Sequence, residues 1–231
     1  MSFKERILSQ VLPFDWSSLL ADQPLLPVWA KVNPAAAPKL ATTLINAGYK
    51  VLEVTLRQEQ SWEGLESLTN SSLTLVAGSL RHPKQVARLQ ALGIRWAVSP
   101  GWCPVLAEAC QKAGLALLPG ISTPGEAMQA YRMGFQRVKL FPAMALGGPA
   151  YLKAIAAPLP ELAFVATGGI SQAMMAEWFA LPQIAALGGS WMLSDTLIDQ
   201  QDWHSIALLA KTSLKTAKEL RQQTLLQGVN P

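Results

Sequence analysis

One acidic residue and two lysines stand in apolar segments with the character of buried strands: Glu53 in VLEVTLR, Lys139 in RVKLFP and Lys31 in LPVWAKV. Of the 15 acidic residues, only Glu53 falls inside such a segment. A buried carboxylate costs several kcal/mol unless it is paired. One interpretation of this carboxylate is a salt bridge to Lys139, Lys31 or Arg57, and the other is a general acid and base. We favour the acid–base role, because active sites also use such pairs.

The alternation of side chains along a strand gives Lys139 a direction. Arg137, Lys139 and Phe141 share one face, and the two residues between them share the apolar face that would pack on helices. A lysine enclosed by apolar walls can lose its proton at neutral pH and act as a nucleophile. The alternative for either strand lysine is a side chain that extends to the surface, and for Lys31 the two interpretations are evenly matched.

Two further groups suit the binding of anions. Arg57 comes at or just past the end of its strand, where a guanidinium fits a carboxylate or phosphate, although it also fits a surface residue that opens the next helix. Two later strands end in Thr-Gly-Gly at 167–169 and Gly-Gly-Ser at 188–190. Paired glycines let backbone N–H groups approach an anion, whereas the alternative is a pair of tight turns. Their occurrence at the last two strands favours a phosphate site.

These residues must be positioned by a repeating unit. Eight apolar runs start 20 to 26 residues apart, at Leu26, Val51, Leu73, Trp96, Ala116, Arg137, Ala163 and Ile184. Segments with helical spacing lie between them, and several end at a glycine in the position of a left-handed cap: Gly48, Gly93, Gly114 and Gly134. Nearly continuous apolar strands that alternate with helices indicate a parallel sheet covered on both faces.

Eight such units predict a closed (β/α)8 TIM barrel. The alternative is an open doubly wound sheet, which would normally show a glycine-rich dinucleotide motif after the first strand, and none is present there. We expect one domain over 1–231. It would comprise an N-terminal cap over 1–25 with a helix at 3–12 that plugs the barrel, the barrel at 26–194, and a C-terminal helix and tail at 195–231, with the closing helix at 203–226.

The composition narrows the class of protein. Half of the 231 residues are hydrophobic, 15% are charged and the net charge is +4 without a basic stripe, which argues against disorder and nucleic-acid binding. The longest uncharged run is shorter than the roughly 20 residues of a membrane span, and we expect no signal peptide. Cys103 and Cys110 are expected to be packing residues in a reducing cytoplasm. We expect neither metal nor cofactor, because His82, His204 and Glu53 do not form a ligand set.

Seven motifs together resemble the 2-keto-3-deoxy-6-phosphogluconate (KDPG) and 4-hydroxy-2-oxoglutarate (KHG) aldolases. They are VLEVTLR (51–57), AGS (77–79), SPG (99–101), PGIST (119–123), KLFPA (139–143), TGGIS (167–171) and GGSW (188–191). The resemblance runs over about residues 26–194, in the family's order and spacing. It implies a class I aldolase built as a homotrimer of (β/α)8 subunits.

The resemblance also implies roles for individual residues. Lys139 would form the Schiff base, Glu53 would shuttle protons, and Arg57 with Ser79 would bind the pyruvyl carboxylate. Pro100 and Phe141 would line the pocket. The distal phosphate would be held by Thr167, Gly168, Gly169, Gly189 and Ser190. The implied substrate is a 2-keto-3-deoxy sugar acid phosphate, which would yield pyruvate and glyceraldehyde 3-phosphate, whereas KHG would yield pyruvate and glyoxylate.

Some residues depart from the family's pattern. Val76 and Ser79 stand where glycine and threonine are common, and Met144 and Leu146 where many members have Glu and Asn. The stretch LGGPAYLKAI also resembles the 6-phosphogalactonate (KDPGal) aldolases. Two further alternatives are a phosphate-binding isomerase or epimerase that uses Glu53 as a base, and a barrel that binds without catalysis.

Overall fold

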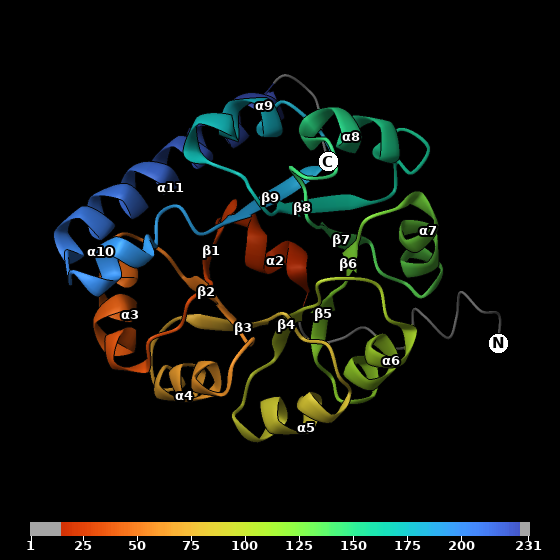
Figure 1. Cartoon of the computed structure of the whole chain (residues 1–231). Coiled ribbons are helices and arrows are strands. Elements are labelled where there is room, and N and C mark those ends of the chain that lie inside the picture. Colours follow the sequence, from red (N-terminus) through yellow and green to blue (C-terminus); the bar gives the residue numbers. More distant parts are fainter. Residues whose placement is uncertain (1–14, 227–231) are drawn as a thin grey trace.

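The computed structural model describes residues 15–226, whose parallel strands form a nearly closed barrel surrounded by helices (Figure 1). The order around the ring is β5-β4-β3-β2-β1-β9-β8-β7-β6. The strands are β1 (Leu25–Trp29), β2 (Val51–Thr55), β3 (Thr74–Gly78), β4 (Trp96–Val98), β5 (Ala116–Leu118), β6 (Gly120–Ile121), β7 (Arg137–Leu140), β8 (Ala163–Thr167) and β9 (Ile184–Gly189). The predicted TIM barrel is confirmed.

The fifth predicted strand differs from the expectation, because Pro119 divides it into β5 and β6. Proline has no backbone N–H and cannot donate to a ladder. Its carbonyl still accepts a 2.8 Å hydrogen bond from the backbone N–H of Lys139. β5 pairs with β4, while β6 pairs with β7 through Gly120 opposite Lys139. The interrupted strand therefore joins the two ends of the ring.

The outer layer consists of short helices and one long closing helix. They are α3 (Ala37–Asn46), α4 (Glu59–Ser67), α5 (Lys84–Ala91), α6 (Pro104–Lys112), α7 (Pro124–Arg132), α8 (Gly148–Ala156), α9 (Met175–Phe179), α10 (Asp195–Asp199) and α11 (Trp203–Leu226), with 3-10 turns at Pro34–Ala36 and Gln172–Met174. The four predicted cap glycines have left-handed φ values between 64° and 92°. The closing helix has its predicted bounds. None of these helices is long and apolar enough to cross a bilayer.

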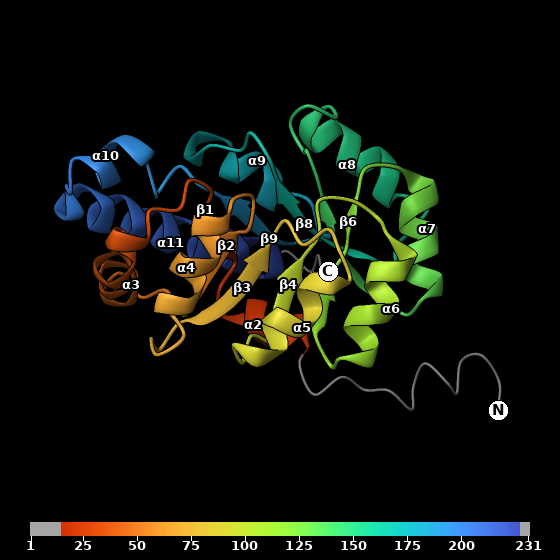
Figure 2. The same cartoon turned by 60° about the horizontal axis from the view of Figure 1, so that its bottom comes forward.

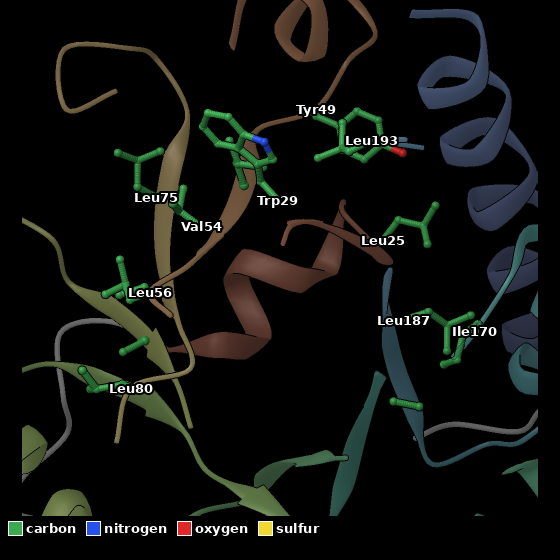
Figure 3. Close-up of a cluster of buried hydrophobic side chains, with 14 of the residues drawn as sticks. Leu25, Trp29, Tyr49, Val54, Leu56, Leu75, Leu80, Ile170, Leu187 and Leu193 are labelled. Atoms are coloured by element: carbon green, nitrogen blue, oxygen red, sulfur yellow. The ribbon is translucent and has the colours of Figure 1, made fainter. Parts of the chain in front are cut away.

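The two faces of each strand have different partners. Side chains on the outer face pack under the helices, and Figure 3 shows several of them, including Leu25, Trp29, Val54, Leu75 and Leu187. A second apolar cluster fills the inside of the barrel toward the end where the strands begin. It consists of side chains from alternate strand positions and from α2 (Trp16–Ala21). Charged groups on the inner face therefore lie at the edge of this cluster or beyond it, toward the ends of the strands.

The helix α2 closes the N-terminal mouth of the barrel (Figure 2). The indole N–H of Trp16 donates to the carbonyl of Ala116, at the start of β5, over 3.2 Å. The same ring packs edge-on against Trp96 at the start of β4, with the ring centroids 5.2 Å apart. A plug at this mouth was expected from a helix over 3–12, which lies outside the described residues.

Candidate active site

Glu53 occupies the middle of β2 and points to the barrel axis. Its neighbours Leu52 and Val54 belong to the outer cluster, so the alternation of the strand turns Glu53 inward. Only 2% of its surface is exposed. A carboxylate in this position needs a partner, because the neighbouring inner positions of the barrel are largely apolar.

That partner is Lys139, whose Nζ lies 3.2 Å from Oε1 of Glu53. Lys139 is 5% exposed and lies on β7, where Val138 and Leu140 face the outer cluster. The predicted direction of this lysine is thus confirmed. Its Nζ also lies 5.5 Å from the centroid of the ring of Phe141, two residues further along the chain. A salt bridge from Glu53 to Lys139 was one of the alternatives that the sequence left open.

The second carboxylate oxygen of Glu53 has a different environment. Its Oε2 is buried and makes no hydrogen bond to any of residues 15–226. An unpartnered buried oxygen is costly unless a water or ligand binds to it. Glu53 therefore offers one oxygen to Lys139 and keeps the other for an exchangeable group.

Two glycines near the pair stand where a side chain would collide with its surroundings. A Cβ at Gly78, the inner residue that ends β3, would lie 2.6 Å from Oε1 of Glu53. A Cβ at Gly120, beside Lys139 in the sheet, would lie 2.5 Å from the carbonyl oxygen of Ser99. The Ser99 hydroxyl accepts from the N–H of Gly120 at 3.0 Å and lies 2.9 Å from the carbonyl oxygen of Gly101. This network fixes the turn that carries Pro100.

Arg57 and Ser79 follow the neighbouring strands β2 and β3, so both lie at the C-terminal mouth above Glu53. The two strand ends are joined by a 2.8 Å bond from the N–H of Leu56 to the carbonyl of Gly78. Arg57 is exposed, and Ser79 is half-buried with a left-handed φ of 58°. Pro100 and Phe141, after β4 and β7, are also half-buried at this mouth.

The residues predicted to hold phosphate end the adjacent strands β8 and β9. Thr167 is buried, and its hydroxyl has no hydrogen-bond partner among the residues that the structure describes. It lies beside Gly188, where a Cβ would be 2.5 Å from the Thr167 oxygen. Gly168 and Gly169 have left-handed φ values of 106° and 78°, and Ser190 is exposed just after β9. The two glycine pairs are therefore neighbours, as expected.

Lys31 does not belong to this group. It follows the end of β1 instead of lying within a strand, and its side chain is 64% exposed. It forms a 3.4 Å surface ion pair with Asp199 of α10. The possibility that Lys31 is a second buried lysine is therefore wrong, because the strand ends at Trp29.

Sequence interpretation assigned no role to Gly78, Ser99 or Gly120, although each lies in one of the seven motifs. The available signal was position: Gly78 and Gly120 fall on the inward face of their strands, close to the charged pair. Among residues 15–226, no group of three or more His, Cys, Asp or Glu side chains is placed to hold a metal ion.

A family model described as KDPG and KHG aldolase matches residues 17–209. The chain belongs to this family. The 2-dehydro-3-deoxy-phosphogluconate aldolase of Pseudoalteromonas atlantica is 38% identical to it over 196 residues, 84% of this chain and 91% of that protein. The KHG/KDPG aldolase of Escherichia coli K12 is 34% identical over 203 residues, which cover 87% of this chain and 95% of that protein.

The fold also matches a solved structure from the KDPG and KHG aldolase family. The KDPG aldolase from Legionella pneumophila has a TM-score of 0.82 and 34% identity, covering 87% of this chain and 98% of that one. It was determined with pyruvate captured at low pH as a covalent carbinolamine intermediate. The pyruvate adduct belongs to that protein.

Proposed function

We propose that this chain is a class I aldolase that cleaves KDPG to pyruvate and glyceraldehyde 3-phosphate, and also accepts KHG. The observation that carries the proposal is the buried contact of 3.2 Å between Lys139 Nζ and Glu53 Oε1 near the C-terminal mouth of the barrel. Barrel enzymes place their chemistry at this mouth. Membership of the family and the carbinolamine of the Legionella relative support the same chemistry.

The reaction would begin at Lys139. Its amine adds to the C2 ketone, and loss of water from the carbinolamine leaves a cationic imine. The C3–C4 bond then breaks: its electron pair moves into the imine to form an enamine, while the C4 hydroxyl loses its proton and becomes the aldehyde. Protonation of C3 and addition of water release pyruvate and regenerate the amine.

Glu53 would move the protons in these steps. Its Oε2 has no hydrogen-bond partner in the described part of the chain, so a water or the substrate can bind to it. A carboxylate at hydrogen-bonding distance from the amine can take the proton lost at C4 and supply one to C3 or to the departing water. Arg57 and the hydroxyl of Ser79 would bind the carboxylate of the substrate, since both follow strands next to Glu53.

The far end of the substrate would lie over β8 and β9. We infer that the phosphate is held by Thr167, Gly168, Gly169, Gly189 and Ser190. Glycine pairs expose backbone N–H groups there, and the Thr167 hydroxyl lacks a partner within residues 15–226. Pro100 and Phe141 would form the side walls between the two ends.

A coupled assay of pyruvate release tests the proposal. KDPG, KDPGal and KHG would be compared at equal concentration, and we expect turnover with KDPG highest and with KHG measurable. Higher turnover of KDPGal would correct the stereochemistry of the substrate. An absence of pyruvate from all three would refute the aldolase and leave an isomerase, an epimerase or a non-catalytic barrel.

We further propose a single-domain protein that assembles as a homotrimer and resides in the cytoplasm. The family resemblance supports the trimer, and apolar side chains exposed on the neighbouring helices α6 and α7 suit a subunit contact: Val105, Met128 and Tyr131. Both cysteines are free, as in proteins of reducing compartments. Light scattering should give about three times the chain mass of 24.9 kDa, and a monomer mass would overturn the trimer.

A further inference from the structure

The segment after β9 is covered by an aromatic ring. Trp191 folds back on the strand end, and a Cβ placed on Gly189 would overlap its six-membered ring. Gly189 does not have the left-handed φ that Gly168 and Gly169 show, so the ring, and not the backbone conformation, requires the glycine at this position. The same segment turns tightly, with the N–H of Leu193 donating to the carbonyl of Ser190 over 2.9 Å.

The ring is anchored on the long closing helix. The indole N–H of Trp191 donates to the hydroxyl of Ser213 on α11 over 3.0 Å, and Ser213 is fully buried. One turn earlier on α11, the carbonyl of Ala210 lies 3.1 Å from the hydroxyl of Tyr49, which is also 3.7 Å from the sulfur of Met192. Residues 191 and 192 are therefore held against one face of α11.

An indole N–H can only donate, and a buried donor without an acceptor is costly. Ser213 therefore fixes the tilt of the Trp191 ring as well as its position. The ring in turn limits where the backbone of Gly189 and Ser190 can lie, because it leaves no space above the glycine. This backbone is the part of the chain that would donate its N–H groups to an anion at the end of β9.

We propose that Trp191, anchored by Ser213, is a positioning residue that sets the affinity for the phosphate end of the substrate. The inference rests on the proposed function, since it deepens the role given to Gly189 and Ser190. Lys139 and Glu53 lie on β7 and β2, and the contacts that hold Trp191 involve neither of them. The anchor therefore acts on phosphate binding and leaves the chemistry at the ketone unchanged.

A purely structural role makes a different prediction. If Trp191 and Ser213 only hold α11 against the barrel, their replacement lowers stability and changes the kcat/KM of every substrate by the same factor. KHG provides the comparison, because it has the keto acid end of KDPG but no phosphate. Inorganic phosphate provides a second probe, because it can occupy the phosphate end alone.

The test uses Ser213→Ala and Trp191→Phe in the full chain. Thr224→Ala is the matched control: Thr224 lies on the same helix and donates to the carbonyl of Phe179 over 2.7 Å, far along α11 from Ser213. We expect the KM for KDPG to rise about tenfold in both variants, and inhibition of KDPG cleavage by inorganic phosphate to weaken in parallel. The kcat for KDPG and the kcat/KM for KHG should stay within about twofold of wild type.

The control should match wild type in every measurement. Equal changes for KDPG and KHG, or an unchanged KM for KDPG together with unchanged phosphate inhibition, would overturn the inference. Trapping of pyruvate on Lys139 with borohydride, which needs no phosphate, shows whether each variant keeps an intact catalytic centre. Should one variant fail to fold, the other decides. A failure of the proposed function itself is recognised separately, because the wild-type chain would then cleave neither substrate.

Discussion

Lys139 and Glu53 come from strands on opposite sides of the barrel, with β1, β9 and β8 between them along the ring, yet Nζ and Oε1 are 3.2 Å apart. The two long side chains meet at the axis, and Gly78 leaves the space that the Glu53 carboxylate occupies. Any carbonyl that reaches the amine from the C-terminal mouth must therefore lie next to the carboxylate.

Removal of Lys139 should cost stability as well as activity. In Lys139→Met, Glu53 is left as a buried charge without a cation, which should lower the free energy of unfolding by about 3 kcal/mol. The double variant Lys139→Met/Glu53→Gln removes that charge and should recover most of the loss. Urea unfolding measures both variants. A double variant as unstable as the single one would show that the pair is not the source of the effect.

Replacement of Glu53 alone should separate proton transfer from imine formation. In Glu53→Gln we expect kcat for KDPG to fall about 1,000-fold, within the range for loss of a general acid or base. Pyruvate should still be trapped on Lys139, although more slowly, because the amine is retained. The rate of pyruvate trapping in a single turnover would be compared with kcat from steady-state kinetics. A variant with normal kcat would remove Glu53 from the mechanism.

A methyl group at Gly78 should displace Glu53. Its Cβ would lie 2.6 Å from Oε1 and 2.8 Å from Cγ of that residue. Glu53 would have to move to relieve these contacts, and a misplacement of about 1 Å in a catalytic group lowers kcat about 100-fold. Gly125→Ala, in the first turn of α7, meets only a hydroxyl at 4.0 Å and should leave kcat unchanged. Equal kinetics for Gly78→Ala and Gly125→Ala would contradict the tight packing around Glu53.

The turn after β6 should be sensitive to acid. Burial raises the pKa of Glu126, but hydrogen bonds from Ser122 and Thr123 outweigh it and lower that pKa below its usual 4.5. Glu126 therefore stabilises the folded state above about pH 4.5, and this contribution is lost as the pH falls through its folded pKa. Melting temperatures between about pH 6 and pH 3 should fall less steeply in Glu126→Gln. Parallel curves for the two proteins would argue against this linkage.

The alternation of side chains along the strands and the glycines at the helix ends predicted much of the fold. The inward direction of Glu53 and Lys139 follows from the two-residue period of a strand, and the helix ends follow from glycines such as Gly48 and Gly134 that take up left-handed φ values. The helix over 203–226 follows from apolar residues at helical spacing. These features are determined by residues close together in the chain, so they can be predicted from the sequence alone.

Other features depend on residues that are distant in sequence. Pro119 divides a strand, but its effect on closure appears only when β6 is placed beside β7. Lys31 was ambiguous because an apolar run does not show where β1 ends, and Asp199, its partner, is far along the chain. Gly78 and Gly120 stood in recognised motifs, but their contacts with Glu53 and Ser99 required the closed barrel. Ser213 carried no sequence signal for its bond to Trp191.

The central claim is that Lys139 forms an imine with a 2-keto acid, and reductive trapping tests it most directly. The protein would be incubated with pyruvate, reduced with borohydride, digested and mapped by mass spectrometry, with Lys139→Met as the control. We expect a carboxyethyl group on Lys139 and none at that position in the variant. An unmodified Lys139 in a protein that still releases pyruvate from KDPG, or full activity of Lys139→Met, would contradict it.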